Sequence, residues 1–287
     1  MDKCLFSGEN ADSEEHIIPK WLQRRYNLWN ESLVIPNGTS MQYRFAKVPV
    51  SKEHNNEFGK IENKVSKGTA SEQELYLWAL KIHSGLIYKD TTLSLDRANP
   101  TSPPVLNIGN FESEIQFFRL LYKHWKNGGE TQPDPIGSVY QFKSIIEVDK
   151  FDFFHSFSVG NIGFNFNNKF ITIFLWDQGD AKLFKVDDNW INHYSKESFL
   201  HEEAQEVRLS KQYLIQHIWG CESGYYCLNR RRSFNIIIAN NKIVLIPPLN
   251  RKEPGRANAK EYEVICRSYG LKLRKFDQDN GHAYSFV

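Results

Sequence analysis

Two short segments near the start of this chain constrain its structure and function more than the rest of the sequence combined. The first is SEEHIIPKWL, residues 13–22, and the second is VPVSKEHNN, residues 48–56. A carboxylate beside a histidine, followed about forty residues later by a histidine and two asparagines, is the set of side chains that one-metal hydrolysis of a phosphodiester requires. The two segments therefore predict a phosphodiesterase site in the first part of the chain.

The chemistry of the individual side chains supports this interpretation. The unperturbed pKa of a histidine, about 6.5, leaves much of the His16 imidazole neutral near pH 7, so His16 can accept a proton as a general base. Glu15 and the carboxamide oxygen of Asn55 are hard oxygen donors of the kind that Mg²⁺ or Mn²⁺ prefers. A bound cation of this type would stabilise the pentavalent phosphate and its leaving oxygen.

At these residues the chain resembles the HNH endonucleases, whose core is a two-stranded ribbon and a helix around one divalent metal. The resemblance covers roughly the first 65 residues. EHIIPKWL resembles the strand that carries a metal ligand and the base, and HNNEFGKIE resembles the start of the metal-holding helix. The resemblance implies that His16 is the base and that Glu15 and Asn55 are metal ligands, with His54 and Asn56 as alternatives to Asn55. A ligating His54 would also admit Zn²⁺ or Ni²⁺.

The chain departs from that family at two places. Many members brace the core with a zinc ion held by two Cys-x-x-Cys pairs, but here CLFS keeps only Cys4, and SKEH keeps at most His54 in place of a cysteine. Structural zinc sites need four Cys or His ligands, so we predict no structural zinc. The asparagine that orients the base also lacks a clear counterpart; Asn37, in the turn-forming sequence IPNG, is the nearest candidate.

These departures leave two functional hypotheses. The first is a divalent-metal-dependent DNA endonuclease, because Glu15, His16 and Asn55 occur together. The alternative is a catalytically decayed HNH-fold protein that binds DNA or acts as an adaptor. Proteins with this layout resemble bacterial or phage-encoded nucleases, including those of restriction and antiphage defence. RNA is an alternative substrate. A partner subunit or a small-molecule activator is an alternative ligand for the C-terminal region.

Charge limits how the chain could contact DNA. The net charge is only +2 and the isoelectric point is near 8.2, so any DNA contact must be local. Phosphate contacts from such local patches would weaken steeply with salt and carry little sequence information. The candidate basic residues are Lys20, Arg24 and Arg25, then Arg44 and Lys47, and finally Arg230–Arg232, for which a solvated surface is an equally good explanation.

Cysteine usage and hydropathy favour a cytoplasmic protein without a membrane span. Four scattered cysteines form no Cys-x-x-Cys unit, which argues against a disulfide scaffold and a redox motif. No apolar run approaches the length of a membrane span, and no signal-peptide pattern opens the chain. Cys221 and Cys227 could bind a metal with His201 or His217, but buried free cysteines fit the unmatched spacings better.

The resemblance implies an HNH-type core in residues 1–68. Periodicity predicts a helical connecting region in 69–136 and an α+β domain in 137–287, so the expected class of the whole chain is α+β. Ser71 and Glu74 have capping-box spacing and predict a helix start. A second helix is expected over 112–126, ended by Gly128-Gly129. Strands are expected over 138–148, 157–166 and 169–176, hairpin turns at Asn167-Asn168 and Asn240-Asn241, and a helix over 257–269.

Overall fold

The computed structural model describes residues 3–34, 40–143, 149–156, 160–183, 235–246, 259–268, 273–277 and 282–286. It contains helices and sheets in the same chain, which confirms the α+β class. The chain divides into two compact units. The first consists of Met1–Glu130 with Ala239–Ile243, and the second of Thr131–Ile238 with Val244–Val287.

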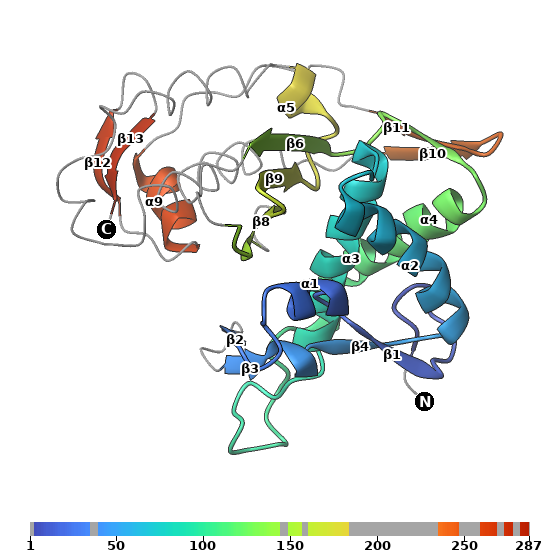
Figure 1. Ribbon diagram of the computed structural model, residues 1–287, viewed down its shortest axis with the longest axis horizontal. Helices are drawn as coiled ribbons and strands as arrows, with labels where there is room; N and C mark the ends of the chain where they lie inside the picture. Colours follow the sequence, from blue (N-terminus) through green and yellow to red (C-terminus); the bar gives the residue numbers. More distant parts are fainter. Residues whose placement is uncertain are drawn as a thin grey trace. The chain divides into compact units, whose positions relative to one another are not determined.

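A two-stranded antiparallel ribbon opens the first unit. It consists of β1 (Ser13–His16) and β4 (Lys47–Val50), with Glu15 opposite Val48 and His16 opposite Lys47. The segment between the strands holds α1 (Lys20–Arg25), the hairpin of β2 (Ser32–Val34) and β3 (Ser40–Gln42), and the 3₁₀ turn η1 (Tyr43–Phe45). After β4, one residue leads into helix α2 (Lys52–Lys67), so the ribbon lies next to the first turn of α2 (Figure 1).

Local signals set both ends of α2. The Ser51 hydroxyl accepts a hydrogen bond from the His54 backbone N–H and caps the first turn. Gly68 follows the last turn with φ of 70°, and its N–H bonds to the carbonyls of Lys64 and Val65. A left-handed conformation at this position favours glycine, which has no Cβ.

Helix α3 (Glu72–Asp90) is the central element of the first unit and packs against both α2 and α4 (Glu112–Lys126) (Figure 1). The predicted capping box is confirmed: the Ser71 hydroxyl accepts from the Glu74 N–H at 3.2 Å, and the Glu74 carboxylate accepts from the Ser71 N–H at 2.9 Å. The prediction for 112–126 is also confirmed. The 3₁₀ turn η2 (Ile108–Asn110) precedes α4, and Gly128, with φ of 68°, follows it.

The second unit contains a four-stranded antiparallel sheet in the order β6-β9-β8-β7. The sheet places Gly163 opposite Phe154, whose ring lies directly over the glycine, so a Cβ there would clash with it. Asn167 and Asn168 both adopt left-handed conformations between β8 and β9, which confirms the predicted hairpin. The strands are β6 (Ser138–Lys143), β7 (Asp152–Ser156), β8 (Asn161–Phe166) and β9 (Lys169–Phe174); parts of two predicted strands, 144–148 and 157–159, lie outside the described residues.

A buried carboxylate ties the end of this sheet to the next segment. Asp177 accepts hydrogen bonds from the N–H and hydroxyl of Ser138, at 2.8 and 2.6 Å, and from the N–H groups of Gly179 and Ala181. Ala181 belongs to the short helix α5 (Asp180–Leu183). The four donors satisfy a group that would otherwise be costly to bury.

The remaining elements lie toward the C-terminus, apart from β5 (Glu130–Gln132), which follows α4. Strands β10 (Asn235–Ala239) and β11 (Lys242–Ile246) are neighbours in one sheet, and the turn residues Asn240 and Asn241 between them are left-handed, as predicted. Helix α9 (Ala259–Ser268) confirms the predicted 257–269 helix within its described part, and β12 (Leu273–Asp277) pairs with β13 (His282–Phe286). Among the described residues, no helix has the length and apolar character to cross a membrane.

Candidate functional site

The candidate residues of the two sequence segments lie on β1 and on α2. Glu15 and His16 are the last two residues of β1, and Asn55 lies in the first turns of α2, where its side chain is half-buried. Glu62 follows Asn55 by seven residues, which is close to two full helical turns, so both project from the same side of α2. The side of α2 that carries Asn55 therefore also carries a carboxylate.

A buried lysine links this side of α2 to the ribbon. The Lys81 side chain, which comes from α3, is fully buried. Its Nζ lies 3.2 Å from Glu15 Oε1 and 3.1 Å from Glu62 Oε1. The same ammonium donates to the backbone carbonyls of His16 and Ile17, at 2.6 and 3.3 Å. One cation thus holds two carboxylates and the end of β1 in a single cluster.

The charges in this cluster depend on one another. Burial by itself would lower the pKa of Lys81, but attraction to Glu62 and Glu15 and their hydrogen bonds outweigh it and raise that pKa above its ordinary value. Burial raises the pKa of Glu62 to about 6, with repulsion from Glu15 adding to the effect and Lys81 opposing it. Within the described part of the chain, Lys81 engages only Oε1 of each carboxylate.

His16 is held as a neutral, buried imidazole. Only 3% of the residue is exposed, and its Nε2 has no hydrogen-bond partner among the described residues. Burial lowers the pKa of His16 to about 4, and the positive charge of Lys20 acts in the same direction. At pH 7 the ring therefore carries no charge and can accept a proton. The ring of Trp29 lies beside it, with the two centroids 5.7 Å apart.

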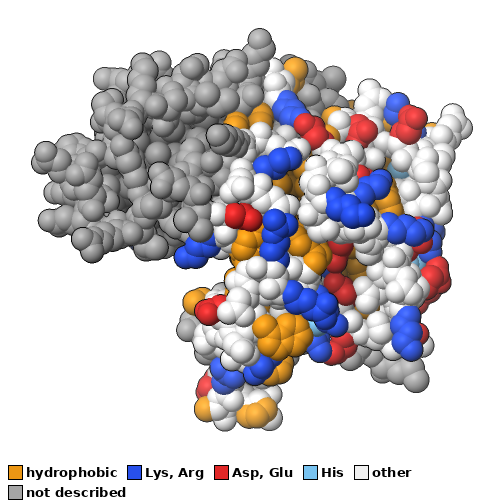
Figure 2. Space-filling model, viewed as in Figure 1, with side chains coloured by type: hydrophobic (Ala, Val, Ile, Leu, Met, Phe, Trp, Pro, Cys, Tyr) orange, Lys and Arg blue, Asp and Glu red, His pale blue; other side chains and the backbone are white. Residues whose placement is uncertain are grey.

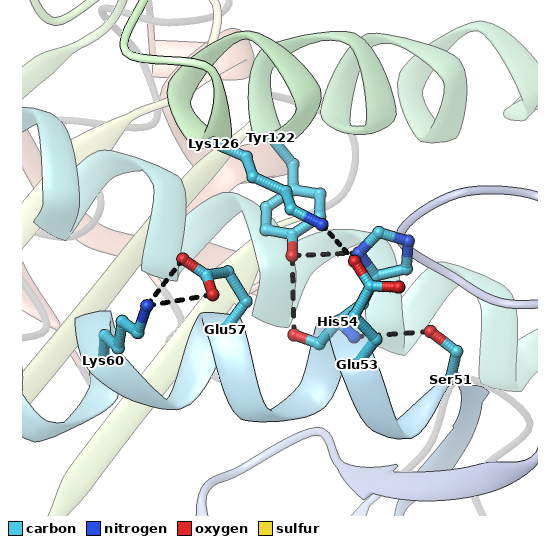
Figure 3. A network of polar contacts seen from close by, with 7 residues as sticks. All are labelled: Ser51, Glu53, His54, Glu57, Lys60, Tyr122 and Lys126. Carbon is cyan, nitrogen blue, oxygen red and sulfur yellow. Dashed lines mark hydrogen bonds and ion pairs between the residues drawn. The ribbon is translucent and has the colours of Figure 1, made fainter.

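The two alternatives to Asn55, His54 and Asn56, occupy different environments, and Figure 3 shows that of His54. His54 points toward α4, where its Nδ1 lies 3.1 Å from the Tyr122 hydroxyl, and its ring lies near that of Phe6. The same hydroxyl approaches the His54 carbonyl, and Lys126 pairs with Glu53 in the same network. Asn56 is exposed. Of the three candidates, only Asn55 projects from the side of α2 that also carries Glu62.

Cys4 and Ser51, the first residues of the CLFS and SKEH segments, are in contact. Cys4 is buried, and its Sγ accepts a hydrogen bond from the Ser51 N–H at 3.3 Å. Arg119, on α4, donates to the carbonyls of Cys4 and Leu5 and so anchors this turn to a helix. Among the described residues, no group of three or more His, Cys, Asp or Glu side chains could hold a metal ion. The contacts here are those of the Cys4 thiol with the Ser51 N–H and of the Arg119 guanidinium with the Cys4 and Leu5 carbonyls.

The predicted basic residues form two groups in the first unit. Lys20, Arg24 and Arg25, on or at the start of α1, are exposed. Arg44 and Lys47 are half-buried: Arg44 donates to Asn30 Oδ1 at 2.8 Å, and Lys47 pairs with Glu14 at 3.2 Å. Other sequence candidates lie outside the described residues, namely Asn37, His201, His217, Cys221, Cys227 and Arg230–Arg232.

Sequence reasoning missed Lys81 and Glu62. A single lysine interrupts the apolar stretch LYLWALKI in α3, and such a lysine, if buried, needs acidic partners. Glu62 is spaced seven residues from Asn55 and could have been placed on the same helical face by that spacing alone. Both signals were present in the sequence, but only the fold shows that Lys81 pairs with Glu15 of the ribbon.

Comparisons of the chain with protein-family models, with curated proteins and with solved structures return no match.

Proposed function

We propose that this protein is a divalent-metal-dependent endonuclease that hydrolyses DNA phosphodiester bonds at the site where Lys81 connects β1 and α2. The observation that carries the proposal is the order and contact of these elements. Strand β1 ends in Glu15-His16, its partner strand β4 leads into a helix that carries Asn55 and Glu62, and Lys81 joins the Glu62 carboxylate to that of Glu15. Proteins with this layout in restriction and antiphage defence motivate the choice of DNA as substrate.

The chemistry of the donors suits a hard divalent cation. Glu15 Oε2, Glu62 Oε2 and the Asn55 carboxamide oxygen are oxygen donors that no described residue engages, and oxygen donors suit Mg²⁺ or Mn²⁺. When bound, the metal would stabilise the charge that develops on the phosphate and on the leaving oxygen. Lys81 holds the Glu15 and Glu62 carboxylates in place, so their orientation does not depend on the metal.

His16 would supply the general base. Its Nε2 is unpartnered among the described residues, and its lowered pKa keeps the ring neutral and able to take a proton from water at pH 7. A pKa near 4 also makes the ring a weaker base than an ordinary histidine. Water must reach this buried nitrogen in the substrate complex for the reaction to proceed.

Plasmid cleavage tests the proposal directly. Purified wild type and His16→Ala would be incubated with Mg²⁺, Mn²⁺, Ni²⁺ or EDTA, with His155→Ala, on β7 of the second unit, as the matched control. We expect metal-dependent nicking or linearisation by wild type and the control, and a rate about 10²- to 10⁴-fold lower for His16→Ala. Equal single-turnover rates for wild type and His16→Ala would refute the assignment of the base.

A pair of neighbouring asparagines tests the metal ligand. Asn55→Ala should lose metal-dependent activity and metal binding, while Asn56→Ala, which alters an exposed side chain one residue away, should keep both. Asn55→Asp should keep metal binding because a carboxylate is also a hard oxygen ligand. Calorimetric titration with Mn²⁺ measures binding without requiring cleavage. Equal loss in Asn55→Ala and Asn56→Ala would contradict the proposed ligand.

A decayed, non-catalytic DNA-binding or adaptor protein is the second candidate, and two observations favour it. The Lys81 ammonium already pairs with Glu15, and His16 is almost fully buried. This candidate predicts DNA binding in EDTA, measured by fluorescence anisotropy, without cleavage in any metal and without Mn²⁺ binding at Asn55. Cleavage by wild type that His16→Ala abolishes would exclude it.

A further inference from the structure

Two large aromatic side chains are exposed beside the candidate site. Trp29 is 39% exposed and Phe45 is 56% exposed, although aromatic residues of this size usually contribute to a core. Trp29 follows α1 and lies next to the His16 ring, and Phe45 ends η1 just before β4. Both therefore belong to the segment between the two strands of the ribbon.

Hydrogen bonds hold these two aromatics in one surface. The Arg44 guanidinium donates to Asn30 Oδ1 at 2.8 Å, and the Gln42 side chain donates to the Asn30 carbonyl at 3.3 Å. Asn30, which follows Trp29, is thereby linked to both Gln42 and Arg44. The Arg44 guanidinium also lies 4.8 Å from the centre of the Phe45 ring. Trp29, Arg44 and Phe45 thus form a joined aromatic and cationic group.

The surroundings of this group are basic. Lys20, Arg24 and Arg25 are exposed on neighbouring α1, and the charges of Lys20 and Lys47 act on the His16 ring. Glu31 is the exposed acidic exception in this segment. In Figure 2, Lys and Arg side chains flank a group of hydrophobic side chains near the place where α1 lies in Figure 1. Cationic side chains around exposed rings match the charge of a phosphate backbone.

We propose that Trp29 and Phe45 form a stacking surface for the unstacked bases of single-stranded DNA next to the phosphate that the site cleaves. This inference rests on the proposed nuclease function and specifies its substrate as DNA with unpaired bases. Aromatic rings stack on any base, and basic side chains track the backbone, so binding would be tolerant of sequence. A duplex keeps its bases stacked, so it cannot offer base faces to these rings unless its bases unstack.

Binding in EDTA tests the inference without cleavage. Fluorescence anisotropy would compare a labelled oligothymidine with a strand of the same length made of abasic sites, at one fixed salt concentration. The two strands carry the same phosphates and differ only in their bases. We expect wild type to bind the base-bearing strand at least about 5-fold more tightly, since each stacked base contributes about a 5- to 150-fold gain in affinity.

Variants assign the preference to the two rings. Trp29→Ala and Phe45→Ala should each reduce the ratio of the two affinities, and Trp29→Phe should retain most of it. Arg25→Ala should weaken binding to both strands equally, because a phosphate contact does not sense the base. Leu95→Ala, which changes another exposed apolar side chain of the first unit, is the control and should change neither affinity. Circular dichroism checks that each variant is folded, and Phe45→Ala tests the inference if Trp29→Ala unfolds.

Two results would overturn the inference. One is equal affinity of wild type for the base-bearing and abasic strands. Failure to bind either strand, as expected if this surface binds a protein, would overturn the inference in the same way. The other is that Trp29→Ala and Phe45→Ala weaken binding to both strands by the same factor. Because the assay contains no metal, a base preference that depends on these rings can be seen even if the protein does not cleave DNA. Conversely, metal-dependent cleavage without a base preference would contradict only this inference and leave the proposed function intact.

Discussion

Replacing Lys81 with methionine is the most informative perturbation of the first unit, because it removes one buried charge and keeps most of the side-chain volume. The ammonium makes close contacts with two carboxylates and two backbone carbonyls. In Lys81→Met, the Glu15 and Glu62 carboxylates, each only 15% exposed, would face one another without a cation. Breaking a buried ion pair by removal of one partner costs about 3–5 kcal/mol, so we expect a loss of about 4 kcal/mol in the free energy of unfolding.

Urea unfolding followed by circular dichroism measures this loss. Lys64→Met is the matched control, because it removes another lysine–glutamate pair of the same unit in which the lysine is 53% exposed, and it should cost no more than about 1 kcal/mol. The double variant Lys81→Met/Glu62→Gln should recover part of the loss, since one of the two unpaired charges is then removed. A loss of less than about 1 kcal/mol in Lys81→Met would refute the view that this cation holds the cluster together.

The same variant probes the metal site. If Glu15 and Glu62 accept a divalent cation, Mg²⁺ should raise the unfolding midpoint of Lys81→Met more than that of wild type, because the metal would then be the only cation between the two carboxylates. Mg²⁺ that stabilises neither protein would count against a metal site at this cluster.

Other parts of the molecule allow further tests. Burial raises the pKa of Asp90 from 3.8 to about 7, so the folded state keeps this proton to a higher pH than the unfolded state does. The free energy of unfolding therefore falls as the pH rises from the unfolded pKa through the folded pKa of about 7. Urea unfolding should therefore show wild type about 2–3 kcal/mol less stable at pH 8 than at pH 5, and Asp90→Asn should remove that part of the pH dependence. Asp177→Ala leaves four hydrogen-bond donors without their acceptor and should lower the free energy of unfolding by about 3 kcal/mol, which a parallel urea series with Ser138→Ala as the milder comparison would check. Tyr122→Phe removes the hydroxyl beside His54 and should cost about 1 kcal/mol in the same assay, with metal binding unchanged. Because burial lowers the pKa of His16 to about 4, the acid limb of the single-turnover cleavage rate should lie below pH 5; a limb near 6.5 would show that the ring is solvated in the complex.

Much of the local structure could be predicted because its causes are local. The Ser71–Glu74 capping box sets the start of α3 through contacts three residues apart. The Asn-Asn pairs at 167–168 and 240–241 form tight turns because asparagine tolerates the left-handed conformation that such turns need. The prediction that Glu15 and His16 are site residues also came from the chemistry of adjacent side chains.

The sequence by itself determined which chemical groups are present and which short segments fold into helices and turns. Only the tertiary structure decided which of those groups meet. Lys81 reaches Glu15 across 66 positions in the chain, and no periodicity encodes a contact of that span. Likewise, His54 and Asn55 are adjacent in sequence, but each residue of a helix is rotated by about 100° from the last, so packing against α4 turned His54 toward Tyr122 and left Asn55 on the side of Glu62.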